Sequence, residues 1–202
     1  MSEIVDKYKT IAKTSEGFFK EKGSKFLSFA YPIQSEDEIK PIQEMLRKKY
    51  YDARHHVFAW KLGAKDEHFR ASDDGEPANS SGPPILGQIR SFELSDILII
   101  VIRYFGGTKL GIPGLINAYK TAAKEAIENN QIITRTITDT FRISFAYEDM
   151  NIVMRKLKDE KIEQFNQIFE MKCSLEIKVR LNDSKRIENI FKEIHSIKIE
   201  KL

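Results

Sequence analysis

An unbroken run of apolar, mostly β-branched residues occupies positions 97–102 of the chain. Because both alternating sets of positions are apolar, this run predicts a strand that is buried on both faces of a sheet. The run is followed by four glycines, Gly106, Gly107, Gly111 and Gly114. Helical spacing then places on one face the residues Leu115, Ala118, Tyr119, Ala122, Ala126 and Ile127. The stretch therefore predicts a buried strand, a glycine-rich turn and a helix that packs closely on the sheet.

A glycine-rich turn between a strand and a helix has two interpretations. Such corners often bind anions, because free amide N–H groups and the helix dipole converge there. The same glycines also serve where the chain only needs positive φ angles and close helix–sheet packing. Residues 107–109 read Gly-Thr-Lys, which is not the order of a P-loop, and the glycine spacing does not match a dinucleotide fingerprint. We therefore predict no nucleotide cofactor.

The elements that precede this run have weaker patterns. Residues 8–33 resemble antiparallel strands separated by turn signals. Ser35 then opens a helix, with Glu38 in the position of a capping-box partner. Residues 52–62 are again typical of a strand. The first half of the chain is therefore expected to be a sheet with helices packed against it.

The second half follows a different order of elements. Strands are predicted at 137–147, 162–168, 171–181 and 197–201, with amphipathic helices at 148–161 and 184–195. This β-α-β-β-α-β order is that of the split ferredoxin-like unit. The change of pattern near residues 130–135 predicts two domains, 1–132 and 133–202, in a protein of the α+β class.

Composition narrows the class of protein further. Apolar residues make up 41% and charged residues 31% of the 202 residues, which is sufficient for a packed core. The net charge of +3 permits a local basic patch but does not by itself predict nucleic-acid binding. The single cysteine, Cys173, excludes an internal disulfide framework and fits a reducing compartment. Because neither a signal-peptide pattern nor a membrane-length apolar segment is found, we expect a soluble, cytoplasmic protein without membrane association.

The most polar loop of the chain, residues 70–84, holds three carboxylates, Asp73, Asp74 and Glu76. Together with His55 they are the candidate catalytic residues, because carboxylates can hold Mg²⁺ or act as acids and bases. The same carboxylates would serve equally to cap the helix that is predicted to begin near Pro83. His55 and His56 point to opposite faces of a strand and lack metal-ligand spacing, so we predict no metal site.

Four separate motifs carry a resemblance to a known family. They are SKFLSFAYPI at 24–33, ARHHVFAW at 53–60, SDDGEPANSSGPPIL at 72–86 and VIRYFGGTKLGIPGL at 101–115. Together and in this order they resemble the YigZ/IMPACT family, over the whole first half of the chain. The second half is similar to the small domain that bacterial members append.

This resemblance implies a fold for each domain and a general type of function. The first domain is expected to be a ribosomal-protein-S5-domain-2-like β-α-β domain. The second is expected to be ferredoxin-like and similar to domain V, the last domain, of elongation factor G. Eukaryotic relatives restrain activation of the amino-acid-starvation kinase, whereas bacterial members have no settled biochemical activity.

The resemblance also implies a site. The polar cluster shared by the family falls on Arg54, His55, Asp73, Asp74, Glu76, Arg103, Tyr104, Gly106, Gly107 and Lys109. The cationic members favour phosphate, and Tyr104 and Phe105 can stack on unpaired bases. We therefore predict as binding residues Arg54, His55, Arg103, Tyr104, Gly106, Gly107 and Lys109.

Three hypotheses for the function follow, in order of preference. The first is a non-enzymatic, translation-related regulator that binds RNA, the ribosome or a translation-factor protein. The second is a protein-interaction regulator without nucleic-acid contact, in which the glycine loop is structural. The third is a metal-assisted hydrolase or phosphoryl-transfer enzyme that uses the acidic loop with His55.

Overall fold

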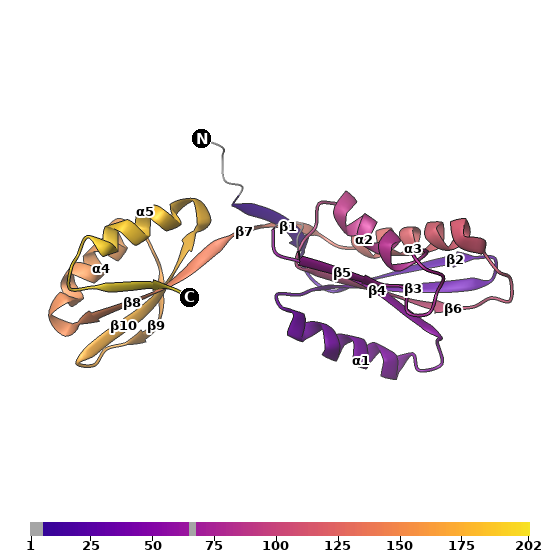
Figure 1. Ribbon diagram of the computed structural model, residues 1–202, viewed down its shortest axis with the longest axis horizontal. Helices are drawn as coiled ribbons and strands as arrows, with labels where there is room; N and C mark the ends of the chain where they lie inside the picture. The colour runs from indigo at the N-terminus through magenta and orange to yellow at the C-terminus, as the bar shows by residue number, and fades with distance from the viewer. Residues whose placement is uncertain (1–5, 65–67) are drawn as a thin grey trace. The chain divides into compact units, whose positions relative to one another are not determined.

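The computed structural model describes residues 6–64 and 68–202 of the chain (Figure 1). It divides them into two compact units, of which the larger is Tyr8–Arg135. The smaller contains Thr136–Leu202 together with Asp6 and Lys7. Helices and sheets occur in both units, so the expected α+β class is confirmed.

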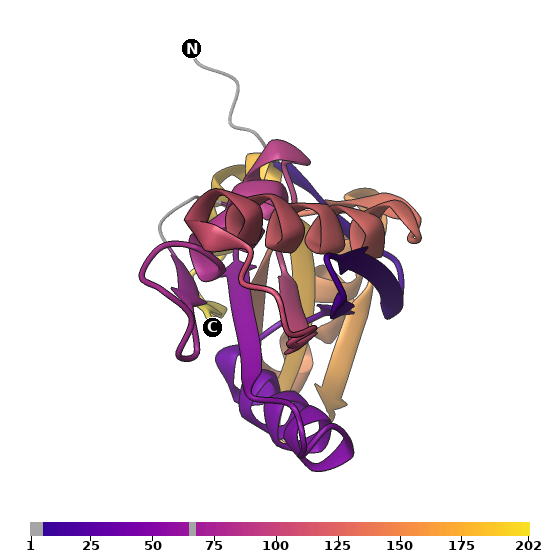
Figure 2. The same ribbon diagram turned by 90° about the vertical axis from the view of Figure 1, so that its right-hand side faces the viewer.

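The larger unit is a five-stranded antiparallel sheet with helices on both faces. The strands lie in the order β2 (Ser15–Glu21), β3 (Ser24–Pro32), β6 (Ile97–Tyr104), β4 (His55–Leu62) and β5 (His68–Ser72). Helices α2 (Gly82–Ser91) and α3 (Gly111–Glu128) cover one face, and α1 (Ile39–Lys49) covers the other (Figures 1 and 2). A short 3₁₀ helix, η1 (Glu36–Glu38), precedes α1. Strands β1 (Lys7–Ile11) and β7 (Ile132–Thr136) form a separate two-stranded sheet.

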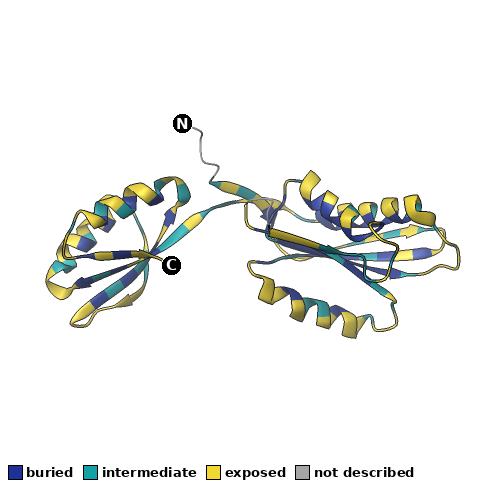
Figure 3. Cartoon of the chain, in the orientation of Figure 1, coloured by how far each residue is buried: buried dark blue, intermediate teal, exposed yellow. Residues whose placement is uncertain are grey.

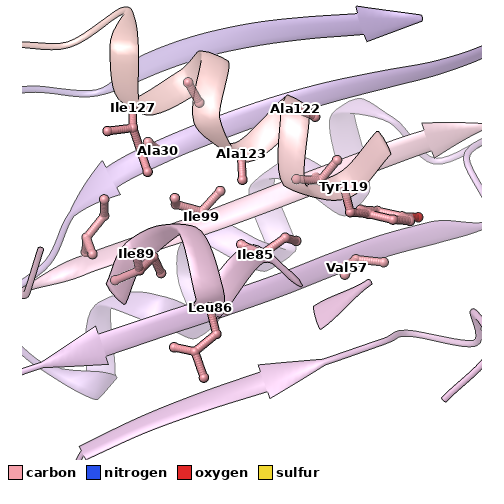
Figure 4. Packing of buried hydrophobic residues seen from close by; sticks show 14 of the residues in the cluster. Ala30, Val57, Ile85, Leu86, Ile89, Ile99, Tyr119, Ala122, Ala123 and Ile127 are labelled. Atoms are coloured by element: carbon pink, nitrogen blue, oxygen red, sulfur yellow. The ribbon is translucent and has the colours of Figure 1, made fainter. Parts of the chain in front are cut away.

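Strand β6 is the centre of this unit, as its apolar run predicted. Residues 97–102 are at most 1% exposed, because odd positions face α2 and α3 while even positions face α1. On the first face the small residues of α3 allow the helix to approach the sheet closely, as Figure 4 shows for Ala123 above Ile99. All the residues predicted for the buried face of α3 are buried. The strand, the turn and the helix are therefore confirmed.

The polar loop is shorter than the sequence indicated. Residues 70–72, expected in the loop, belong to the edge strand β5, and α2 begins at Gly82 rather than Pro83. An edge strand has only one partner, and β5 has no buried residue, so it lacks the apolar alternation that identifies a strand. The prolines of α2 lie in its first turn, where a missing N–H removes no helical hydrogen bond.

The smaller unit has the predicted order of elements. They are β8 (Thr138–Ala146), η2 (Tyr147–Asp149), α4 (Met150–Asp159), β9 (Gln164–Ile168), β10 (Lys172–Arg180), α5 (Leu181–Lys192) and β11 (Lys198–Lys201). The strands are arranged as β11-β8-β10-β9. Their buried residues, coloured dark blue in Figure 3, form a core that includes Cys173 at 1% exposure. Within the described parts of both units, no helix has the length and apolar character needed to cross a membrane.

Candidate functional site: a cationic cavity beside the start of α3

A cavity of about 440 Å³ lies in the larger unit, beside the start of α3. Its polar lining consists of Arg54, His55, Glu76, Arg103 and Lys109. Its apolar lining includes Pro77, Phe105, Leu110, Ile112 and Leu115. The cavity thus combines two arginines, one lysine and one carboxylate with an aromatic ring and aliphatic groups. Four of the predicted binding residues and two of the candidate catalytic residues meet here.

The pairing of three strands explains why these residues meet. Arg103, near the end of β6, lies opposite His55 of β4 on one side and opposite Phe26 of β3 on the other. All three side chains point to the face of the sheet that α2 and α3 cover, since they lie in register with the odd-numbered positions of β6. The last residue before β4, Arg54, extends the same edge.

A buried ion pair forms the floor of the cavity. Arg103 Nη1 lies 2.7 Å from Glu76 Oε1, with the two side chains only 7% and 4% exposed. The Tyr119 hydroxyl donates to the same Oε1 at 2.8 Å, and burial together with this carboxylate raises the pKa of Tyr119 far above its usual value. The guanidinium of Arg103 also lies against the rings of Phe26 and Phe105. Arg103 Nε, in contrast, is buried and has no hydrogen-bond partner among the described residues.

Asp73 acts on α2 rather than on the cavity. Its carboxylate accepts hydrogen bonds from the Ser81 hydroxyl at 2.7 Å and from the backbone N–H groups of Asn79 at 2.8 Å, Ser81 at 3.0 Å and Gly82 at 2.8 Å. Burial alone would raise the pKa of Asp73, but these hydrogen bonds outweigh it and lower the pKa. Asp73 therefore satisfies amide groups at the start of α2, which is the capping role that its position in the sequence allowed.

Asp74 joins α1 to the sheet. One carboxylate oxygen lies 2.8 Å from Arg47 of α1, and the other accepts the backbone N–H of His56 at 2.6 Å. Its carbonyl oxygen accepts a hydrogen bond from Nδ1–H of His55 at 2.9 Å. The three carboxylates of the loop are thus directed to different parts of the fold. No group of three or more His, Cys, Asp or Glu side chains in the described part of the chain is arranged to hold a metal ion.

Two cationic side chains at the rim of the cavity have no ion-pair partner among the described residues. Arg54 and Lys109 are exposed, and neither side chain forms an ion pair with a residue that the structure describes. The ring of Phe105 is 55% exposed and the side chain of Ile112 is 53% exposed beside them. Helix α3 begins here without a capping side chain and without an acidic residue in its first turn. The rim of the cavity therefore offers a ligand two cationic groups, free backbone N–H groups and an aromatic ring.

The remaining predicted binding residues do not line the cavity. Tyr104 follows Arg103 on β6 and points to the α1 face, where its hydroxyl donates to Asp52 at 2.7 Å. That hydrogen bond, with burial, raises the pKa of Tyr104 to about 12. Gly106 packs against the backbone of Gly23, and Gly107 adopts a positive φ of 87°. The two glycines therefore shape the turn that carries Phe105 and Lys109.

Tyr119 is a part of the site that sequence reasoning missed, and Ser24 also contributes to the site. Ser24 Oγ accepts the backbone N–H of Gly106 at 3.1 Å and lies 3.5 Å from Arg103 Nη2. Tyr119 was expected only as a core residue. Its hydroxyl is the one polar side-chain atom on an otherwise apolar helix face, which was the available signal that it has a buried polar partner.

His56 is a buried histidine on the face of the sheet opposite the cavity, and its burial makes the stability of the protein depend on pH. It is 5% exposed, and neither ring nitrogen has a hydrogen-bond partner among the described residues. Burial lowers the pKa of His56, and nearby Arg47 lowers it further. The unfolded chain, with a histidine pKa of about 6.5, then binds more protons than the folded one, so stability is lost as the pH falls from about 6.5 through the lower folded pKa.

We expect His56→Gln to flatten the dependence of the free energy of unfolding on pH between about 7 and 5, where one histidine contributes at most about 1.4 kcal/mol per pH unit. Urea unfolding at several pH values measures this slope. His195→Gln, at an exposed histidine, is the matched control and should keep the original slope. Equal slopes for the His56 variant and the unaltered protein would contradict the assignment of a buried neutral imidazole.

The chain therefore has two α+β units, and the sheet of the larger unit carries a buried Arg–Glu pair beneath exposed cations. A family model described as the Impact N-terminal domain matches residues 22–127, about half of the chain. The chain therefore belongs to the IMPACT family. The resemblance stated from the sequence is confirmed.

Individual relatives extend the match beyond that domain. The IMPACT family member YvyE of Bacillus subtilis is 27% identical over 158 residues, covering 78% of this chain and 73% of the relative. YigZ of Escherichia coli is 32% identical over 131 residues, covering 64% of each. A crystal structure described as that of a hypothetical protein matches 98% of both chains with a TM-score of 0.75 at 22% identity. That similarity shows that the fold of the whole chain occurs in a solved structure.

Proposed function

We propose that this chain is a non-enzymatic, translation-related regulator that binds RNA, alone or within the ribosome, through the cavity beside the start of α3. One observation carries the proposal: the exposed, uncommitted cations Arg54 and Lys109 line the same cavity as the exposed ring of Phe105. Cations suit phosphates and an aromatic ring suits unpaired bases, which is the combination that single-stranded RNA requires.

The topology of the units supports the connection with translation. The order β11-β8-β10-β9 in the smaller unit is consistent with a ferredoxin-like unit similar to the last domain of elongation factor G. We propose that the larger unit corresponds to the ribosomal-protein-S5-domain-2-like fold. Both of these likenesses are to domains of proteins that act on the ribosome or within it.

A protein partner is the second candidate. The exposed side chains of Phe105 and Ile112 favour it, because exposed aromatic and aliphatic groups beside cations are also typical of protein interfaces. Metal-assisted catalysis has less support. Asp73 and Asp74 are held by α2, α1 and β4, while Oε1 of Glu76 already binds Arg103 and Tyr119.

The test compares two double variants with equal changes in charge. We expect Arg54→Ala with Lys109→Ala to weaken binding to single-stranded RNA at low salt. Loss of two phosphate contacts reduces the magnitude of the slope of log K against log salt by about 1.4. Lys40→Ala with Lys48→Ala, on exposed positions of α1, should leave both affinity and slope unchanged.

The cellular version follows the protein by sucrose-gradient sedimentation of a lysate at low and moderate salt, with and without RNase. Co-migration with ribosomal particles, lost in moderate salt and in the Arg54/Lys109 variant, is the expected result. Sedimentation as a free small protein under every condition, together with an unchanged salt slope in the variant, would refute the RNA proposal. A partner that stays bound after nuclease treatment would favour the second candidate.

A further inference from the structure

We infer that the cavity accepts the terminal nucleotide of an RNA strand, with a terminal phosphate monoester held between Arg54, Lys109 and the first turn of α3. This inference rests on the proposed RNA-binding function and deepens it. It assigns the ligand as a strand end, rather than an internal stretch of single-stranded RNA.

The dimensions of the site favour a single nucleotide. Its volume of about 440 Å³ lies within the range of about 300–1,000 Å³ that is typical of small-molecule sites. Proteins that track an extended strand use a groove with several aromatic rings, on which successive bases stack. Here the lining contains one aromatic side chain, Phe105, which is sufficient for one base.

The charges favour a terminal phosphate over an internal one. Arg54, Arg103 and Lys109 oppose a single carboxylate, that of Glu76, so the lining has an excess of two positive charges. A phosphate monoester carries a charge of about −1.5 to −2 near neutral pH, whereas an internal diester carries one negative charge. The monoester therefore matches the charge of the cavity more closely.

The start of α3 supplies a place for that phosphate. Gly111 and Ile112 of its first turn line the cavity, and α3 is 18 residues long. Because the first turn has no capping side chain and no acidic residue, its free N–H groups and the helix dipole are available to an anion. Independently, Arg103 lines the same cavity at 6% exposure and has an unpartnered Nε–H. That Nε–H is shielded from solvent, so Arg103 contributes the positive charge of its guanidinium to the cavity rather than this hydrogen bond.

His55 supplies the acceptor that ribose needs. Its Nδ1 donates to the carbonyl oxygen of Asp74, which can only accept, so in the neutral ring Nε2 carries the lone pair. That nitrogen has no hydrogen-bond partner among the described residues. The other polar groups of the lining are mainly donors, and Oε1 of Glu76 already accepts from Arg103 and Tyr119. A ribose hydroxyl, which can donate, therefore pairs with His55.

The experiment uses one short oligoribonucleotide in three forms: with a 5′-phosphate, with a 3′-phosphate and with neither. Affinities for the full chain are measured by fluorescence anisotropy. We expect one of the phosphorylated forms to bind at least about tenfold tighter than the unphosphorylated form. The position of the phosphate in that form identifies which end of the strand is bound.

Lys109→Ala should abolish this preference, while Lys40→Ala, on α1, should retain it. A 2′-deoxy substitution at the preferred terminal nucleotide should weaken binding through the loss of the hydroxyl that pairs with His55.

The outcomes separate this inference from the proposed function. Equal binding of all three forms, still sensitive to Arg54→Ala with Lys109→Ala, would overturn the terminal assignment and leave RNA binding in place. If no form binds, both the inference and the proposed function are wrong. Binding of adenosine monophosphate without binding of any oligonucleotide would overturn the assignment to an RNA strand and indicate a free nucleotide instead.

Discussion

Glu76→Ala is expected to lower the free energy of unfolding by about 3–5 kcal/mol, the usual loss when one partner of a buried ion pair is removed. The substitution leaves the guanidinium of Arg103 without its counter-charge at 7% side-chain exposure, and it leaves the Tyr119 hydroxyl without an acceptor. Urea unfolding at neutral pH, followed through the fluorescence of buried Trp60, measures the change.

Two comparisons separate this effect from the simple loss of a surface charge. Glu128→Ala removes a glutamate whose pair with Lys124 is about half exposed, so we expect a change of no more than about 0.5 kcal/mol. Glu76→Leu combined with Arg103→Met replaces the buried pair with apolar groups and should recover much of the lost stability. A loss below about 1 kcal/mol for Glu76→Ala would show that Arg103 reaches solvent and that the pair is not buried.

Gly106→Ala is expected to destabilise the larger unit by about 3 kcal/mol, the upper end of the usual range for overpacking. An added Cβ would lie 1.9 Å from the carbonyl carbon of Gly23 and 2.1 Å from the backbone nitrogen of Ser24. Because the neighbours are backbone atoms, they cannot move aside as a flexible side chain would. The turn that carries Phe105 and Lys109 would be displaced with them, so the proposed binding of RNA should weaken as well.

Gly87 provides the matched control with the opposite sign. It is exposed within α2, and an added Cβ would meet no atom within 4 Å. Gly87→Ala should therefore raise the free energy of unfolding by about 0.5–1 kcal/mol, since alanine favours a helix over glycine. Comparable losses at both glycines would mean that the close approach of Gly106 to Gly23 is not the cause.

The strongest periodic segments of the fold could be predicted from the sequence. Strand β6 and helix α3 have long, unambiguous apolar patterns, and local periodicity was sufficient to identify them. Strand β5 could not be identified in this way, because a short, solvated edge strand is stabilised by pairing with β4 rather than by an apolar face of its own. This pairing joins segments that are separated in the sequence, so it cannot be predicted from the apolar pattern within one segment.

For a related reason, only part of the candidate site could be predicted from the sequence. The resemblance supplied Arg54, His55 and Arg103, but their proximity depends on the register between β4 and β6, which no local pattern specifies. Tyr104 was predicted among the binding residues, although alternation along β6 directs its side chain away from the face of Arg103 and towards α1. The separate roles of the loop carboxylates depend on which amide groups surround them in three dimensions.

Strand β4 also limits how the length of the chain can change. Its odd positions face the cavity side of the sheet, beginning with His55, and its even positions face α1, beginning with His56. A one-residue insertion within β4 would shift one flank of the strand by one position and exchange the two sets of side chains there. Trp60 would then be directed towards α2 and α3, and Ala59 towards α1. Two-residue insertions preserve the alternation, so length variation in this strand is expected to occur in pairs or as a bulge.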